Sequence, residues 1–456
     1  MVKKNQIIEI KIDDINFPNK GVGSFEDDKI VIKDTIPGQT VSARISKKRS
    51  SGIEGSLIEV IERSPLETEI GCKHFGVCGG CSYQKLTYQN ELELKKNQVL
   101  KLLDNAGISD YEFLGIIDAP EHEGYRNKCE FSFGDEYKGG PIALGMRKKG
   151  SFYEVVNLTD CNIIDEDYLK IIKTVKEFFE NKNIPFYHKS THEGQLRHLV
   201  VRKGAYTGEI LINLVTTSEI TFSMEELKDA ILDNDFKGTI AGILHTKNDS
   251  IADIVKSDET NIIYGKDYFM DKLLGLDFKV SAFSFFQTNT LGAEKLYSVV
   301  RNFVGDTKDK VVFDLYCGTG TIGQIVAKNA KKVIGIELVE EAVEAARKNA
   351  LLNGIDNCEF IAGDVLKKVD EITDSPDLIV VDPPRDGIHP KAITKIIDFG
   401  ASEIVYVSCK PTSLVRDLQV FEQNGYKVKK VVLVNQFPRT NHCESVCLLQ
   451  RVWFHI

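Results

Sequence analysis

The sequence predicts an α/β protein whose C-terminal part is a doubly wound, mainly parallel sheet, preceded by a small β-barrel and a mixed α+β region. Three observations lead to this prediction. From about residue 278 onward, near-continuous apolar segments alternate with helical ones, as buried parallel strands with helical crossovers require. The last two apolar segments lie close enough in sequence to form an antiparallel pair. Residues 1–62 instead hold short segments of alternating apolar and polar residues, separated by turn residues.

Length and composition limit the classes of protein to which this chain can belong. The 456 residues are enough for two or three domains, and 42% apolar with 27% charged residues is typical of a globular protein. No apolar stretch approaches the roughly 18 residues of a membrane helix, and the N-terminus lacks a secretory signal. We therefore expect a cytoplasmic protein, in which ten cysteines indicate metal binding or catalysis more than disulfides. The net charge of −9 gives no overall basic footprint for nucleic acid.

Three segments follow from the pattern. Residues 1–62 are expected to form the barrel, a type of module that often binds RNA or single strands but also serves only for packing. Residues 63–270 are mixed and contain one clear helix, 91–107, with Gly107 as its C-cap. Residues 271–456 form the doubly wound domain, whose ligands should lie beyond the carboxyl ends of the strands.

The first strand of that domain is followed by a glycine-rich turn, Gly318–Gly323, with the pattern G-x-G-x-x-G. The next strand ends at Glu337, about 20 residues further on, where a carboxylate can accept hydrogen bonds from ribose hydroxyls. A dinucleotide and S-adenosylmethionine both fit this pattern. Asp314 inside the first strand suits an amino-acid ammonium, and Asp382–Arg385 (DPPR) has no role in hydride transfer, so S-adenosylmethionine is favoured. Asp364, after the third strand, is then expected near the adenine, although a helix N-cap explains it as well.

A cysteine stands at the tip of another strand. The apolar run 404–407 stops at Cys409, and Pro411 forbids further pairing. A thiolate that adds to C6 of a pyrimidine makes C5 nucleophilic toward a sulfonium methyl group, and a base must then remove the C5 proton. Such chemistry needs an extruded base and a nearby carboxylate, for which Glu444 is the candidate. Lys410 and Arg416 could lower the pKa of the thiol or bind phosphates.

Five motifs, which run along the chain as SFFQTN, DLYCGTGTIG, VVDPPRDG, VSCKPTSLVRDL and QFPRTNHCE, together with GYRNKCEF and LGMRKKGSFYEVVNLTDC between residues 124 and 161, resemble the RNA uracil-C5 methyltransferase family over essentially the whole chain. The resemblance implies a Rossmann-like class I methyltransferase domain with Cys409 as nucleophile and Glu444 as base. It also implies these S-adenosylmethionine contacts: Gln287, Tyr316, Thr321, Glu337, Asp364 and Asp382. The chain departs from the family at Lys410, where asparagine is usual, and at Asn435-Gln436, where aspartate-methionine is usual.

Three further cysteines are closely spaced: Cys72, Cys78 and Cys81, as C-x5-C-x2-C. The C-x3-C-x2-C spacing of radical S-adenosylmethionine enzymes is absent, so we expect a fourth thiol to close the site. The resemblance selects Cys161, and Cys129 is the rival. Four thiolates fit tetrahedral zinc or a [4Fe–4S] cluster, and the resemblance implies the cluster.

The combined hypothesis is a three-part cytoplasmic enzyme. Residues 1–62 resemble a TRAM barrel (OB-like) that binds RNA, and 63–270 form a central iron–sulfur and RNA-binding domain whose helix 91–107 can pack on the catalytic domain. Residues 271–456 methylate C5 of a flipped uridine. The resemblance implies 23S rRNA as substrate, because the bacterial tRNA branch lacks both the barrel and the cluster; tRNA is the alternative. An iron–sulfur NAD-dependent oxidoreductase and a non-catalytic RNA-binding assembly factor are remoter alternatives. No membrane or obligate protein partner is indicated.

Overall fold

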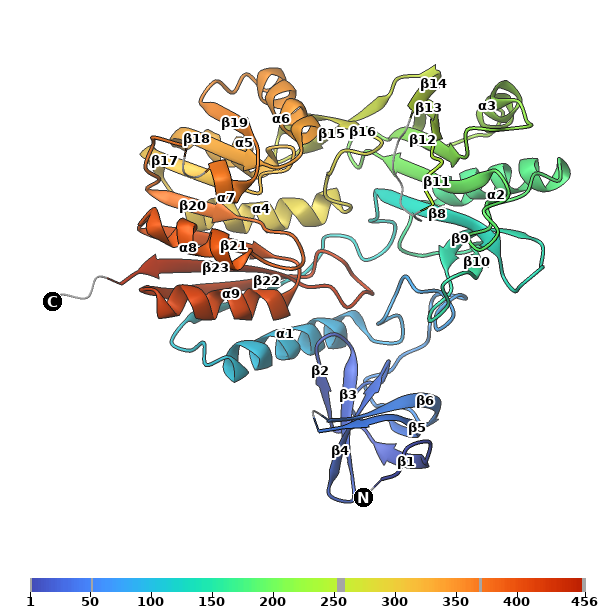
Figure 1. The fold of residues 1–456 in the computed structure, drawn as a ribbon, viewed down its shortest axis with the longest axis horizontal. Coiled ribbons are helices and arrows are strands. Elements are labelled where there is room, and N and C mark those ends of the chain that lie inside the picture. The colour runs from blue at the N-terminus through green and yellow to red at the C-terminus, as the bar shows by residue number, and fades with distance from the viewer. Residues whose placement is uncertain (1, 51, 252–258, 369–370, 453–456) are drawn as a thin grey trace.

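The computed structural model describes residues 2–50, 52–251, 259–368 and 371–452. Their strands form four sheets (Figure 1), with strand orders β1-β5-β6-β4-β3-β2, β10-β9-β8-β11-β12-β13-β14, β15-β16 and β19-β18-β17-β20-β21-β23-β22-β7. Within these residues, no helix is both long enough and apolar enough to cross a membrane.

The N-terminal sheet is built from alternating sequences. Burial alternates along β1, and Ile8 and Ile10 enter the same core as Ile30 and Ile32 of β4. All neighbours pair antiparallel except β4 and β6. Its strands are β1 (Ile7–Lys11), β2 (Asp14–Asn16), β3 (Lys20–Phe25), β4 (Asp28–Lys33), β5 (Thr40–Arg49) and β6 (Gly52–Glu62).

The central sheet carries two helices, α2 (Glu166–Asn181) and α3 (Met224–Leu232). Tyr168 and Val175 of α2 pack in one core with Phe131 and Leu199 of the sheet. Its strands are β8 (Lys128–Asp135), β9 (Ile142–Arg147), β10 (Val155–Asn157), β11 (Leu196–Lys203), β12 (Glu209–Thr216), β13 (Thr239–Lys247) and β14 (Glu259–Gly265). A hairpin, β15 (Tyr268–Leu273) and β16 (Leu276–Ser281), leads from it to the C-terminal sheet.

The C-terminal sheet confirms the predicted doubly wound arrangement. Five parallel strands are followed by an antiparallel pair. These strands are β17 (Thr307–Leu315), β18 (Ala330–Glu337), β19 (Cys358–Ala362), β20 (Leu378–Val381), β21 (Glu403–Ser408), β22 (Tyr426–Val434) and β23 (Glu444–Arg451). The helices around them are α4 (Thr290–Val304), α5 (Thr321–Ala327), α6 (Glu340–Leu352), α7 (Val365–Lys368), α8 (Pro390–Asp398) and α9 (Pro411–Gln423).

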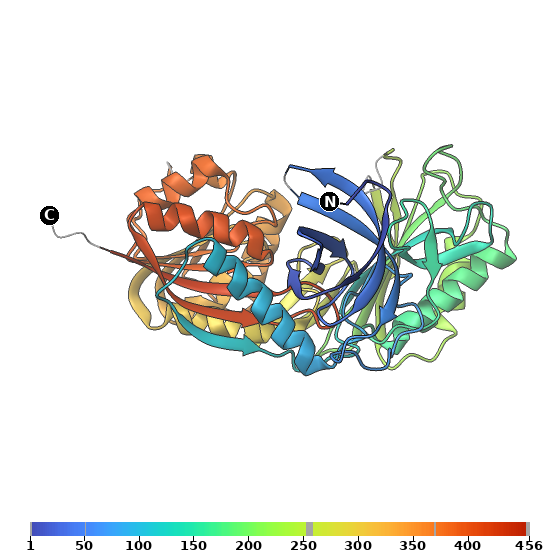
Figure 2. The same cartoon turned by 90° about the horizontal axis from the view of Figure 1, so that it is seen from below.

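This sheet gains an eighth strand from the distant segment 88–117. Strand β7 (Glu112–Ile117) pairs parallel with β22, and helix α1 (Tyr88–Asn105) runs beside α9 (Figures 1 and 2). The helix starts three residues before the predicted 91–107 because the Thr87 side chain caps the N–H of Asn90. It ends two residues before the predicted end, at a turn in which Gly107 has a φ of 73°.

Candidate active site at the carboxyl end of the parallel sheet

The glycine-rich turn links β17 to α5. Gly318 and Gly320 both have a positive φ, 54° and 71°, and a Cβ on Gly320 would lie 2.6 Å from the ring of Phe360. Asp314 fixes the start of the helix, because its Oδ2 accepts the Gly323 N–H at 2.7 Å. The tight turn therefore requires glycine for both its backbone and its packing.

The second oxygen of Asp314 points to a missing partner. Asp314 is fully buried, and its Oδ1 has no hydrogen-bond partner among the described residues. Burial raises its pKa to about 8, and the charges of Asp382 and Glu337 add to this shift. Glu337, at the end of β18, accepts the Gly318 N–H at 3.1 Å. A cationic or N–H donor from a ligand would satisfy Asp314 at this position.

Tyr316, Thr321 and Asp364 also lie around this turn. Burial raises the pKa of Tyr316 to about 12, and the charge of Asp364 contributes. Thr321 is buried, with its hydroxyl 3.4 Å from that of Thr319. Asp364 is exposed and accepts the Leu366 N–H at 3.0 Å. It therefore caps the N-terminus of α7, which was the alternative to a contact with the adenine.

The strand register brings the predicted nucleophile and base together. Ser408 of β21 pairs with Ser445 of antiparallel β23, so the next residue out on each strand, Cys409 and Glu444, are adjacent. Burial raises the pKa of Cys409 to about 11, with added repulsion from Glu444 and Asp382 and an opposing effect of Arg385. Burial also raises the pKa of Glu444 to about 8. The charge of Asp382 adds to this increase, and the charge of Arg385 opposes it. Cys409, Glu444, Asp382 and Arg385 thus form one electrostatic cluster.

The two cations considered from the sequence, Lys410 and Arg416, pair with other carboxylates. Arg416 binds the Asp417 carboxylate at 2.8 and 2.9 Å, and the Lys410 ammonium lies 3.8 Å from Asp386. Neither is among the groups that shift the pKa of Cys409, which is raised rather than lowered. Arg385 is the cation that opposes the increase, and binding of phosphates by Lys410 and Arg416 stays a prediction.

Tyr297 of α4 lies between the glycine-rich turn, with Asp314, and the cluster around Cys409. It was not identified from the sequence. Its hydroxyl is hydrogen-bonded to Gln287, whose Oε1 accepts the Gln436 amide at 2.9 Å. Burial raises the pKa of Tyr297, followed by the charges of Asp382, Glu444 and Asp314. Its position in an apolar helical pattern resembled ordinary core, so the sequence held no sign of this role.

A buried ion pair on α1 holds the loop that precedes Glu444. Lys95 and Glu91 are 1% and 0% exposed and lie 2.8 Å apart. The Lys95 ammonium also donates to the Asn435 Oδ1 at 2.6 Å, and Glu91 accepts the Arg439 N–H at 2.9 Å. The Arg439 carbonyl in turn accepts the N–H groups of residues 82 and 83, directly after Cys81. The loop 435–443 is therefore fastened to both α1 and the cysteine-rich segment.

We expect Lys95→Met to destabilise the protein by about 1.5–3 kcal/mol, because it removes the charged hydrogen bonds to Glu91 and Asn435 and leaves the Arg439 Nη1, 3.8 Å away, as the remaining cation beside Glu91. Denaturant unfolding measures this change. The matched control is Lys96→Met on the next, more exposed position, where an ion pair with Glu93 should be worth less than about 1 kcal/mol. Equal losses for the two variants would contradict a supporting role for the buried pair.

The predicted cysteine ligands lie apart from this site, in the central region. Cys72, Cys78, Cys81 and Cys161 are half-buried free thiols. Burial raises the pKa of Cys81 to about 12, and the other three thiols add to the shift, so the four share one neighbourhood. The rival Cys129 is fully buried against Arg126. Among the described residues, no three His, Cys, Asp or Glu side chains are arranged so that they could hold a single metal ion.

The chain is similar to known proteins over nearly its whole length. The family model described as tRNA (uracil-5-)-methyltransferase matches residues 87–452. Relatives described as uncharacterized RNA methyltransferases from Caldanaerobacter subterraneus and Clostridium acetobutylicum are 51% and 52% identical, over 98% and 99% of this chain and 99% of each relative. A solved structure of Pyrococcus abyssi tRNA (uracil-54, C5)-methyltransferase with S-adenosyl-L-homocysteine is 27% identical, with a TM-score of 0.77, over 97% of this chain and 100% of that one.

Proposed function

Because the chain belongs to the tRNA (uracil-5-)-methyltransferase family, we propose that it methylates C5 of a uridine in RNA, with S-adenosylmethionine as methyl donor. The observation that carries the proposal is the adjacency of Cys409 and Glu444 at the mouth of the sheet, beside Asp382 and Arg385. This pairing supplies a nucleophile and a base on one side of a bound pyrimidine, as C5 methylation requires. Family membership leaves no support for the oxidoreductase alternative.

In the proposed reaction, the Cys409 thiolate adds to C6 of the flipped uracil, and C5 becomes nucleophilic. S-adenosylmethionine is a co-substrate that supplies the methyl cation equivalent to C5 and leaves as S-adenosylhomocysteine. Glu444 then removes the C5 proton, the C6–S bond breaks, and the thiolate is released. The product is 5-methyluridine, and Glu444 must pass its proton to water before the next turnover.

The co-substrate is proposed to lie along the glycine-rich turn. The unpaired Oδ1 of buried Asp314 supports this placement, because an amino-acid ammonium would supply its missing donor. The other proposed contacts are Gln287, Tyr316, Thr321, Glu337, Asp364 and Asp382. Burial raises the pKa of Asp382 to about 7, a shift that a neighbouring cation would reverse.

The activity should rise with pH. Both groups act in their deprotonated forms, and their pKa values lie above their ordinary values, about 11 for Cys409 and about 8 for Glu444. We expect kcat/KM to increase about tenfold per pH unit between pH 8 and 9, and more steeply below pH 8. Arg385→Ala removes the charge that lowers both pKa values, so its rate should fall most at pH 7 and recover toward pH 9. Lys410→Ala is the control and should keep the wild-type profile; an Arg385→Ala profile parallel to wild type would contradict this assignment.

The RNA is proposed to be 23S rRNA, with tRNA as the second candidate. The N-terminal sheet and the cysteine set favour rRNA by the resemblance described above. The Pyrococcus abyssi enzyme favours tRNA, because it aligns with 97% of this chain and therefore with most of the N-terminal sheet as well. The test incubates anaerobically purified protein and methyl-labelled S-adenosylmethionine with 23S rRNA and tRNA transcripts in parallel. Label in 5-methyluridine of only one RNA identifies the substrate, and label in neither refutes the proposed function.

We also propose that Cys72, Cys78, Cys81 and Cys161 hold a [4Fe–4S] cluster. Their shared neighbourhood supports this. In a cluster each thiolate binds its own iron, so the four sulfurs surround a cube and need not converge on one ion. Anaerobically purified protein should contain about four iron and four sulfide per chain, lost in Cys81→Ser and kept in Cys129→Ser. One zinc per chain, without sulfide, would show that the site takes a single ion instead.

For the domain division we propose a TRAM-like barrel at 1–62, a central domain within 63–270 and a methyltransferase domain at 271–456. The pairing of β7 with β22 and the contacts of α1 support adding residues 88–117 to the methyltransferase domain.

A further inference from the structure

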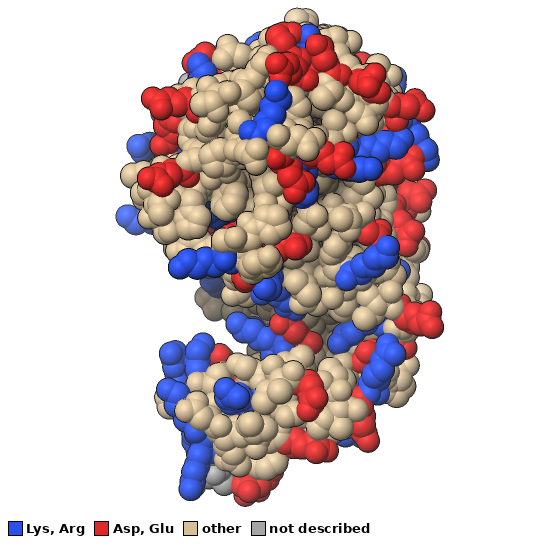
Figure 3. Space-filling view, turned by 90° about the vertical axis from the view of Figure 1, so that its right-hand side faces the viewer, with Lys and Arg blue, Asp and Glu red and all other residues tan. Residues whose placement is uncertain are grey.

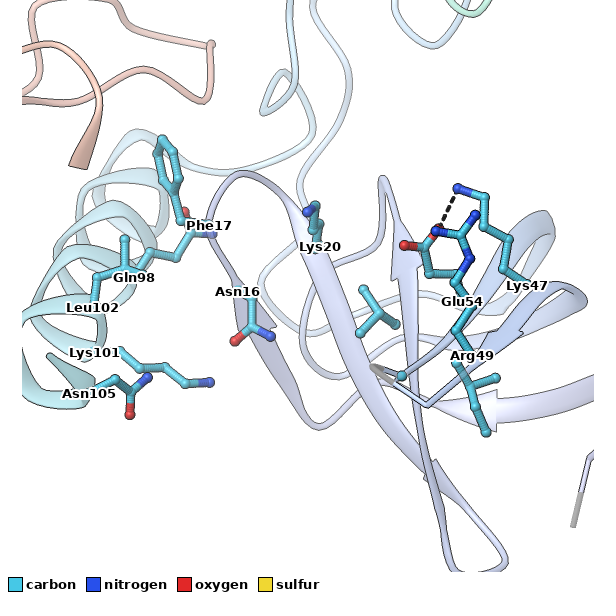
Figure 4. A pocket seen from close by; sticks show the side chains of 13 residues that line it. Asn16, Phe17, Lys20, Lys47, Arg49, Glu54, Gln98, Lys101, Leu102 and Asn105 are labelled. Carbon is cyan, nitrogen blue, oxygen red and sulfur yellow. Dashed lines mark hydrogen bonds and ion pairs between the residues drawn. The ribbon is translucent and has the colours of Figure 1, made fainter. Parts of the chain in front are cut away.

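A cavity of 420 Å³ lies between the N-terminal sheet and helix α1 (Figure 4), and none of the residues that line it belongs to the cluster around Cys409. Its volume falls within the range of about 300–1,000 Å³ that ligand pockets occupy. Strands β2 to β6 and the turn after β2 line one side, and α1 lines the other. The two sides come from segments that are distant in the sequence, so the cavity exists only in the assembled protein.

The lining is basic although the whole chain is acidic. It holds Lys20, Lys47, Arg49 and Lys101 against a single carboxylate, Glu54. Lys47 lies 3.1 Å from Glu54, and Lys101 pairs with Asp14. No ion pair involves Lys20 or Arg49 among the described residues, so their charges are available to a ligand. Lys and Arg side chains gather along one edge of the N-terminal part, beside the hollow that separates it from the rest of the molecule (Figure 3).

Two further groups suit a planar ligand. Phe17, in the turn after β2, is half-buried at the cavity. Gln98 of α1 is 2% exposed; its amide nitrogen donates to the Tyr83 hydroxyl at 3.2 Å, while its Oε1 has no partner in the described parts of the chain. A buried acceptor without a donor is costly, so a ligand N–H at this position would stabilise the complex.

We propose that this cavity binds one unstacked nucleotide of the RNA substrate, with its base on Phe17 and Gln98 and its phosphates at Lys20 and Arg49. This inference rests on the proposed function, because the RNA that binds here is taken to be the RNA that the protein methylates. Aromatic stacking together with cations along the backbone is the way proteins hold single-stranded nucleic acid. The nucleotide is distinct from the target uridine, which must reach Cys409, so the cavity fixes a second point of the RNA.

The test measures RNA binding without any methylation. Uridine-containing RNA hairpins that carry 4-thiouridine in a single-stranded segment are irradiated with the full-length protein, and the crosslinks are mapped by mass spectrometry. We expect a crosslink within residues 16–20 or on α1 near Gln98. Phe17→Ala should weaken binding about 5- to 100-fold, and Phe17→Tyr should restore it. Arg49→Ala should reduce the slope of log affinity against log salt by about one.

Arg44→Ala is the matched control, since this exposed arginine lies on the same strand as Arg49 but outside the cavity. It should leave affinity within about twofold. Wild-type affinity in both Phe17→Ala and Arg49→Ala, each folded by circular dichroism, would overturn the proposal. Protection of the site by uridine monophosphate but not by unlabelled RNA would also overturn it, in favour of a free nucleotide. A crosslink at Phe17 in a protein that methylates no RNA would refute the proposed function, but it would still support the cavity as a nucleotide-binding site.

Discussion

Cys409→Ala should abolish formation of 5-methyluridine, with a loss on the order of 10⁴- to 10⁶-fold in turnover. C5 of uracil is a poor nucleophile until a thiolate adds at C6, and the pairing register places this thiol opposite Glu444 across the β21–β23 pair. Alanine removes the nucleophile without introducing bulk into the half-buried position. The measurement is methyl transfer to whole rRNA and tRNA transcripts, with the nucleosides resolved by mass.

The matched control is Cys358→Ala, which removes another half-buried thiol from the same sheet, on β19. Its Sγ faces the Gly323 carbonyl, at 3.7 Å, rather than the cluster of Cys409. We expect it to keep activity within a few-fold of wild type. Comparable activity in Cys409→Ala and wild type would refute covalent catalysis by this thiol, and absence of 5-methyluridine with wild-type protein would favour a non-catalytic RNA-binding role.

Glu444→Gln should lower turnover by about 10²- to 10⁴-fold and leave RNA covalently attached to the protein. Glutamine keeps the size of the buried side chain but cannot accept the C5 proton, so the methylated adduct cannot eliminate Cys409. The attached RNA should survive denaturing electrophoresis and carry the labelled methyl group. A single turnover of label per chain is the expected stoichiometry.

The double variant Cys409→Ala/Glu444→Gln serves as its control and should form no adduct. Glu403→Gln, a half-buried carboxylate at the opposite end of β21, should form none either and should retain activity. Free, methylated RNA released by Glu444→Gln at the wild-type rate would exclude Glu444 as the base and would make Asp382, whose charge also raises the pKa of Glu444, the next candidate.

Seven strands of the doubly wound sheet could be predicted because each is an apolar run bounded by turn residues, and helices separate the parallel ones. The antiparallel ending followed from the short connection between β22 and β23. Strand β7 could not be predicted as part of this sheet, since its partner β22 lies far away in the sequence and parallel pairing leaves no local pattern. The bounds of α1 differed because the cap at Thr87 was not recognised.

The residues of the candidate site likewise include some that the sequence predicts and some that it does not. Cys409 and Glu444 stand out because their chemistry is unusual at strand ends; the register puts them at neighbouring positions, and their roles stay predictions. Tyr297 was missed because a tyrosine in an apolar helix has the same pattern as core packing. Lys95 was missed for a related reason: its partner Asn435 is 340 positions away, and a lysine on a helix is normally solvated.

The fastening of α1 to the loop 435–443 has a consequence for biosynthesis. The N-terminal sheet pairs entirely within residues 7–62 and can fold while the ribosome is still translating. Helix α1, made soon afterwards, carries the Lys95–Glu91 pair, whose other partners, Asn435 and Arg439, are translated about 340 codons later. A chain that stops before residue 435 therefore lacks both partners of this pair, and it also lacks strand β23 with Glu444. The nucleophile–base pair can therefore assemble only after residues 435–444 have been made.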